Sequence, residues 1–253
     1  MNALTLFVIE IFVISGAILF LHRLRHFLGI GLLLIFLGSV QFYQTVLASS
    51  VYNEIYEGVV ISPGSAILFN STLFCVLLIF HTEGVKATRT SIFGVLFSNV
   101  LLSILSIITL EQLNTDEHSI FQDYLNEIFN FDVTLFLIGT CLLLFDLFLI
   151  VIIYQFINLK ANQIPSFFKI LIPLSLVGLF DSVMFYSINF FSVDSDLNLL
   201  FSNVIGKQLV IIPFSICMYF YLKASKLIQV KEMPQNLDDV ICVFTFTDNN
   251  EKN

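Results

Sequence analysis

Residues Val133–Phe156 read VTLFLIGTCLLLFDLFLIVIIYQF, and this stretch decides the fold class. It contains one charged residue, Asp146, and its apolar residues do not alternate with polar ones. About 20 mostly apolar residues cross the hydrocarbon core of a membrane as a helix. A membrane β-strand instead needs about ten residues of alternating polarity. The stretch therefore predicts a transmembrane helix that is apolar on all its sides.

The composition of the whole chain agrees with a membrane protein. Of 253 residues, 57% are hydrophobic and 12% are charged, the mean hydropathy is +0.93 and the formal net charge is −8. Soluble domains carry about 25% charged residues. The composition excludes a disordered chain and a secreted disulfide scaffold. It also excludes a nucleic-acid-binding protein, which needs a basic face.

Six more stretches resemble the first in length and polarity. We therefore predict an all-α fold, a polytopic membrane bundle of seven transmembrane helices within a transmembrane domain of residues 1–222. Residues 223–253 are predicted to form a short cytoplasmic tail. The seven predicted spans are Ala3–Leu21, Phe27–Ala48, Val59–Phe80, Thr90–Leu110, Val133–Phe156, Ile170–Phe191 and Leu200–Leu222.

The basic residues predict the orientation of the bundle. Ten of the eleven Lys and Arg residues lie in His22–His26, His81–Arg89, Ile157–Lys169 and the tail, and the alternate loops contain none. Cytoplasmic loops carry the excess of basic residues. The N-terminus is therefore predicted outside and the C-terminus in the cytoplasm. No basic region precedes the first span, so we do not expect a cleaved signal peptide.

Four charged residues fall inside the predicted spans, where each costs ~2.5–3.5 kcal/mol. Helix rise places Glu10 and Lys207 about 10 Å from the outer end, Asp181 about 15 Å and Asp146 about 20 Å. The equal depths predict a Glu10–Lys207 charge pair, which either fastens the bundle or serves the function. Asp146 and Asp181 then lack a base, so they are either neutral acids between helices or part of a solute or cation site.

Uncharged polar residues gather in the same outer half. We predict a ligand-binding cavity lined by Asp181, Lys207, Asn70, Asn99 and Asn203, since a polar solute is recognised by hydrogen bonds. The alternative is that these amides only join neighbouring helices. The segment Ser62-Pro-Gly-Ser65 predicts a chain that enters as a loop and begins its helix at Ser65, with free N–H groups aimed at the cavity.

Two blocks of sequence resemble a known family. The first is Ser62-Pro-Gly-Ser-Ala-Ile-Leu-Phe-Asn-Ser-Thr72, followed by Glu83-Gly84, Lys86-Ala87 and Arg89. The second is Phe180-Asp181-Ser182 with Phe185, then Gly206-Lys207 and Pro213. Within Val60–Leu102 and Phe180–Leu222, the chain resembles the vitamin-uptake-type family that includes queuosine precursor transporters. The resemblance implies a helical bundle that imports a small heterocycle across a bacterial inner (plasma) membrane, with Asp181 and Lys207 as the carried-over polar groups.

The chain also departs from those transporters. They carry an acidic pair at the inner end of the third helix, where this sequence has Leu78-Ile-Phe-His81 and keeps only Glu83. Membrane input domains of some bacterial signalling proteins look similar, lack that pair and end in a short link to a cytoplasmic output. The segment Asp239-Val240-Ile241, with Phe244, resembles such a link.

The predicted function is uptake of a small solute, a heterocycle or vitamin precursor, through a cavity in the bundle. The alternative is a seven-helix sensor that signals to a separate cytoplasmic partner. The expected partners are the lipid bilayer and a small polar or heterocyclic solute, with no nucleic acid. We expect no cofactor or metal, because the four cysteines have no CxxC spacing. We expect no enzyme, because no HExxH, GxSxG or phosphate loop is present.

Overall fold

The computed structural model describes residues 2–56, 58–115, 128–129, 133–161, 163–190 and 197–227. Six helices of this part are long and apolar enough to cross a membrane, which agrees with the predicted helical membrane bundle. The predicted tail lies outside the described residues from residue 228 onward. The helices are α1 (Ala3–Leu28), α2 (Gly31–Ser50), α3 (Phe69–Thr115), α5 (Val133–Lys160), α6 (Ser166–Phe190) and α7 (Leu197–Ala224).

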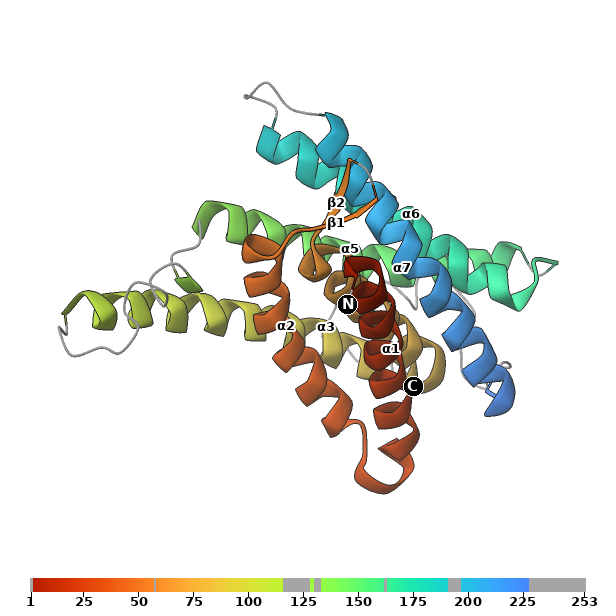
Figure 1. The fold of residues 1–253 in the computed structure, drawn as a ribbon. Coiled ribbons are helices and arrows are strands. Elements are labelled where there is room, and N and C mark those ends of the chain that lie inside the picture. Colours follow the sequence, from red (N-terminus) through yellow and green to blue (C-terminus); the bar gives the residue numbers. More distant parts are fainter. Residues whose placement is uncertain are drawn as a thin grey trace.

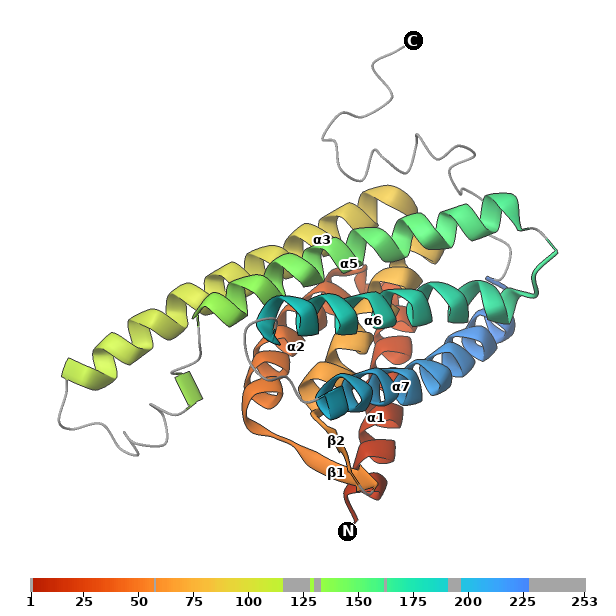
Figure 2. The same ribbon diagram turned by 90° about the horizontal axis from the view of Figure 1, so that it is seen from above.

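The helices pack largely in the order of the chain. Each of α2, α3, α5, α6 and α7 contacts its predecessor, and α1 also contacts α7, so the bundle closes on itself. The later part of α3 runs beside α5, and both extend to one side of the other helices (Figures 1 and 2).

Helix α3 is broken at Gly84. The residue has φ +78° and ψ −167°, a left-handed conformation that a side chain would strain. The break divides α3 into a first arm, residues 69–83, and a second arm, residues 85–115. The sequence predicted two spans with a loop at His81–Arg89. The structure replaces that loop with a bend at one residue, so residues 64–113 form one apolar helical stretch.

The first arm of α3 forms the centre of the core. Residues 73–80 are consecutive and each is at most 1% exposed. A helix that is apolar and buried on all sides belongs inside a bundle rather than on its surface. On one side of this arm, the Phe74 and Phe214 rings pack 5.1 Å apart, which joins α3 to α7.

A short hairpin precedes α3. Strand β1 (Asn53–Tyr56) pairs antiparallel with β2 (Val59–Ile61), and Asn53 lies opposite Ile61. The sequence placed Val59 at the start of a span and did not predict strands. A π-helical turn, η1 (Gly64–Leu68), follows and leads into α3. The prediction that the helix begins at Ser65 is therefore confirmed to within one residue.

The hairpin rests on the first turns of α7. The Val60 N–H donates to Ser202 Oγ at 3.3 Å. Gly206 makes the close approach possible, since a Cβ there would lie 2.8 Å from Ile61 Cγ2. We call the part of the molecule that contains the hairpin and the first turns of α7 the hairpin end. The region around the break in α3 at Gly84 is called the Gly84 end.

Candidate functional site

The centre of the candidate site is a buried ion pair between α6 and α7. Lys207 Nζ donates to Asp181 Oδ2, and the two residues are only 2% and 7% exposed. The ammonium also lies 4.3 Å from the centre of the Phe69 ring on α3, a cation–π contact. Three helices therefore hold one charge pair away from bulk water.

This pairing corrects the predicted Glu10–Lys207 charge pair. Equal depth does not decide which face of a helix a side chain occupies, and Lys207 faces α6 and α3. Helix α1 does close on α7, but through neutral contacts such as Ser15 Oγ with Cys217 Sγ at 3.9 Å. Glu10 lies half-buried on α1. The expectation that Asp181 has no base was also wrong. Lys207 was placed closer to the outer end than Asp181, but its long side chain reaches the Asp181 carboxylate.

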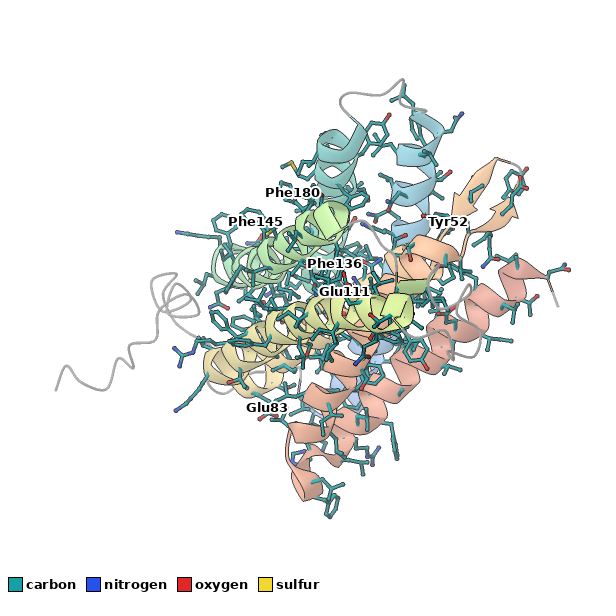
Figure 3. The ribbon with its side chains drawn as sticks, turned by 90° about the vertical axis from the view of Figure 1, so that its left-hand side faces the viewer. Tyr52, Glu83, Glu111, Phe136, Phe145 and Phe180 are labelled. Carbon is teal, nitrogen blue, oxygen red and sulfur yellow. The ribbon has the colours of Figure 1, made fainter. Side chains whose placement is uncertain are left out.

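The ion pair borders a cavity of about 680 Å³ at the hairpin end. This volume is in the range of small-molecule sites. The hairpin, α2, α3, α5, α6 and α7 all contribute to its wall. Its aromatic lining includes Tyr52, next to the hairpin, and Phe136 of α5, both labelled in Figure 3. The polar residues of the lining include Gln41, Gln44, Thr45, Ser62, Ser65, Asn99, Thr140, Asp181, Ser182, Asn203 and Lys207.

Four of the five predicted ligand-binding residues lie in this wall: Asn99, Asp181, Asn203 and Lys207. Asn203 Oδ1 accepts from Ser182 Oγ at 3.4 Å. Asn99 is 5% exposed, and its Oδ1 has no hydrogen-bond partner among the described residues.

Asn70 is the exception, because it lies behind the wall. Its Nδ2 donates to Ala66 O at 2.7 Å, and a Cβ on Gly178 would lie 3.7 Å from its Oδ1. In the structure, Asn70 is therefore not among the residues that line the cavity.

Several wall residues were not predicted as site residues. Gln41 and Gln44 of α2 are one helical turn apart, so their spacing already indicated a shared polar face. Gln41 Nε2 donates to Thr72 Oγ1 at 3.1 Å, whereas Gln44 Oε1 has no partner among the described residues. Thr140 of α5 was harder to predict as a site residue, since it is a single hydroxyl group within an apolar run.

Asp146 lies directly behind the ion pair. It is fully buried on α5 and within electrostatic range of both Asp181 and Lys207. The two carboxyl groups are close neighbours without an aligned hydrogen bond, and both Asp146 oxygens lack a partner among the described residues. The repeated Leu-Phe-Asp sequences explain this arrangement. Phe145 and Phe180, one on α5 and one on α6, pack 5.4 Å apart (Figure 3). The aspartates that follow them in the sequence, Asp146 and Asp181, are both buried.

A family model described as a vitamin uptake-like sensor matches residues 15–222. The chain belongs to this family. The match includes most of α1 and continues to the last turn of α7, so it contains every residue of the cavity wall. It confirms the predicted resemblance to vitamin-uptake-type membrane proteins and their sensor relatives. No curated protein and no solved structure matches the chain.

A second polar cluster occupies the Gly84 end of the molecule. His22 of α1 bonds Thr82 Oγ1 through Nε2 at 2.8 Å and the Tyr221 hydroxyl of α7 through Nδ1 at 2.7 Å. Next to it, Arg25 Nε donates to Glu83 Oε1 at 2.6 Å. Glu83 lies well away from Tyr52, which borders the cavity (Figure 3). We call these residues, together with His81 and its partners, the junction.

His81 connects the break in α3 to the end of α7. Its Nδ1 bonds the Tyr154 hydroxyl of α5, and its Nε2 lies 2.9 Å from Leu227 O, just past the end of α7. Since a carbonyl only accepts, Nε2 carries the proton and Nδ1 accepts from Tyr154. The three residues before Gly84 therefore tie α3 to α1, α5 and the segment that follows α7.

A fully buried apolar layer separates the cavity from the junction. Phe74, Ile150 and Phe214 have no exposed area. Along each of α3, α5 and α7, a residue of the cavity wall is followed by a residue of the apolar layer and then by a residue of the junction. The series are Phe69, Phe74 and His81 on α3, Leu143, Ile150 and Tyr154 on α5, and Lys207, Phe214 and Tyr221 on α7.

Proposed function

We propose that this chain is an inner-membrane sensor that binds a small polar or heterocyclic solute in the cavity at the hairpin end. The observation that carries the proposal is the buried Asp181–Lys207 pair at the wall of a cavity of about 680 Å³. Charged residues inside a membrane protein are costly and usually face a substrate or ion pathway. Unpartnered amide oxygens in the same wall add groups that a solute would satisfy.

The proposed topology has seven crossings, with α3 crossing twice. Its first arm would run inward from the hairpin end, and its second arm would return outward after the break at Gly84. The basic residues support an N-terminus outside and a C-terminus inside, since His81–Arg89 and the end of α7 carry Lys and Arg. The cavity then opens to the outside and the junction faces the cytoplasm.

The buried apolar layer favours sensing over uptake. A transporter opens its site to each side in turn, whereas a sensor needs access from one side only. Here Phe74, Ile150 and Phe214 close the cavity toward the junction. Uptake remains the second candidate, because Asp181 and Lys207 are the polar groups that the transporter resemblance implies. A signal would leave through the junction to a cytoplasmic partner, by way of the segment after Leu227.

A binding screen followed by a flux measurement tests this function. Purines, deazapurines and vitamins are screened by thermal shift on the purified protein, and the compounds that stabilise it are measured for accumulation in proteoliposomes. We expect binding without accumulation. Accumulation that the Lys207→Met variant abolishes would instead establish uptake.

A matched variant tells binding from folding. Asn99→Ala removes a wall amide whose oxygen has no partner in the part of the chain that the structure describes, so the melting temperature without solute should hardly change. Affinity should fall by about fivefold or more, since a hydrogen bond contributes ~1 kcal/mol. Unchanged affinity of every bound compound in this variant and in Lys207→Met would contradict the proposed site.

A further inference from the structure

The charges around the cavity do not balance by themselves. Asp146, Asp181 and Lys207 contribute two acids and one base, at 0%, 7% and 2% exposure. Helix α2 and turn η1 contain no charged residue, and α3 contributes Phe69 and Asn70 to this region. Glu10 of α1 and Glu54 of the hairpin are not among the residues that line the cavity. An uncompensated buried charge is costly, so a neutral set holds one proton on its two carboxyl groups.

Four buried acceptor oxygens in and behind the wall have no hydrogen-bond partner among the described residues. Gln44 Oε1 and Asn99 Oδ1 lie in the wall, and both oxygens of Asp146 lie behind it, with no donor among the described residues. Lys207 already has two partners, the Asp181 carboxylate and the Phe69 ring. An anionic solute would have to displace Asp181 from the lysine. A cationic solute with N–H groups would supply the donors that are missing.

We infer that the cavity selects a solute with one positive charge carried on N–H groups, of the amidinium, guanidinium or ammonium class, and releases one proton when it binds. The inference rests on the proposed binding function. Before binding, one protonated carboxyl, one carboxylate and one ammonium sum to zero. After binding, two carboxylates, the ammonium and the solute cation again sum to zero.

Asp181 connects the proton to the water of the cavity. It lines the wall and lies beside Asp146, whereas Asp146 is screened from the cavity by its neighbours. The proton leaves the two carboxyl groups through Asp181 into the cavity as the solute enters. The solute N–H groups bond the Asp181 carboxylate and the free amide oxygens, and Lys207 stays in place.

Three probes of the same shape and different charge test this selectivity. Benzamidinium, benzamide and benzoate carry charges of +1, 0 and −1 on a planar group attached to one ring. Their binding is measured by calorimetry on the full chain in lipid nanodiscs. We expect benzamidinium to bind at least about tenfold more tightly than benzamide, since a charge-assisted hydrogen bond is roughly twice as strong as a neutral one. Benzoate should bind more weakly than either.

The proton is counted from the same titrations. The measured enthalpy is compared between phosphate and Tris, whose ionisation enthalpies differ, and the slope gives the number of protons released. We expect about one proton per benzamidinium and none per benzamide. This count uses the unmodified protein and does not depend on any variant.

Two variants locate the proton. Asp146→Asn should reduce the proton count to near zero and the preference for benzamidinium to below about threefold. Ser215→Ala is the matched control, because Ser215 is equally buried on α7 and outside the cavity wall. It should change neither quantity. An unchanged proton count in Asp146→Asn would overturn the inference.

The probes also separate this inference from the proposed function. If benzamide or benzoate binds best and Lys207→Met abolishes that binding, the cavity is a solute site and the inferred charge preference is wrong. Failure of benzamidinium to bind at all also contradicts the inference. The wider solute screen tests the binding function independently of these three compounds.

Discussion

Replacing Lys207 with Met removes the only base of the buried set and is the most informative single change for stability. Breaking a buried ion pair by removing one partner costs ~3–5 kcal/mol. Here the cost has an upper limit, because a proton can replace the lost positive charge. Protonating an aspartate of ordinary acidity at pH 7 costs about 4 kcal/mol, at 1.36 kcal/mol per pH unit above ~3.9. We therefore expect a loss of roughly 3–4 kcal/mol at pH 7.

The same reasoning gives the sign of the pH dependence. At pH 5, protonating the aspartate costs only about 1.5 kcal/mol, and this cost limits the loss of stability in Lys207→Met. Acid should therefore restore most of the free energy of unfolding that this variant loses at pH 7. Unfolding in SDS, followed by far-UV circular dichroism, measures the free energy at each pH. A loss that stays constant from pH 5 to pH 7 would refute the assumption that a proton substitutes for the lysine.

A double-mutant cycle identifies the partner of the lysine. Asp181→Asn combined with Lys207→Met should recover at least 1 kcal/mol relative to the sum of the single losses, because contacting residues couple. Glu10→Gln is the matched control. Its effect should add to that of Lys207→Met within about 0.5 kcal/mol, as expected of residues without a shared contact. Coupling to Glu10 instead of Asp181 would restore the pairing predicted from depth.

Three further substitutions, one of them with a matched control, test the packing and the junction. Gly64→Ala should lower the free energy of unfolding by ~1–3 kcal/mol or more, since its Cβ would lie 2.3 Å from Ala48 N. Gly94→Ala is the control: a Cβ there would have nothing within 4 Å, so this variant should be neutral or stabilising in the same SDS titration. Gly84→Ala should cost ~1–3 kcal/mol, because φ +78° with ψ −167° is a conformation that essentially only glycine adopts; a neutral result would argue against the break. His81→Phe should speed backbone hydrogen exchange of residues 222–227, and unchanged exchange would contradict the role given to the junction.

The sequence predicted the parts of the fold that depend on polarity along the chain. Apolar runs located the six long helices of the described residues, and the residues Ser62–Ser65 indicated where α3 begins. Asn99 and Asn203 were expected in one cavity because both lie in the outer half of their spans, and both line the cavity in the structure. These inferences need only the length and polarity of each span.

The sequence could not predict the features that depend on rotation about the helix axes. Depth alone paired Lys207 with Glu10 and placed Asn70 in the cavity wall, whereas the faces of α7 and α3 decide otherwise. To predict that Asp146 lies close to Asp181, one would need the rotations of α5 and α6 about their axes and the way in which the two helices pack. The break at Gly84 looked like a loop, because polar residues end an apolar run in either case. The hairpin has too few residues to give a strand signal.

Thiol labelling from the two sides of the membrane tests most directly whether the cavity is an outward-facing solute site. Asn203→Cys and Ser215→Cys place probes on the same helix, the first in the cavity wall and the second fully buried. In intact cells, a membrane-impermeant thiol reagent should modify position 203 and leave position 215 unmodified. A compound found in the binding screen should slow labelling at position 203. Labelling of position 203 only after lysis, or equally fast with and without the bound compound, would contradict the proposed site.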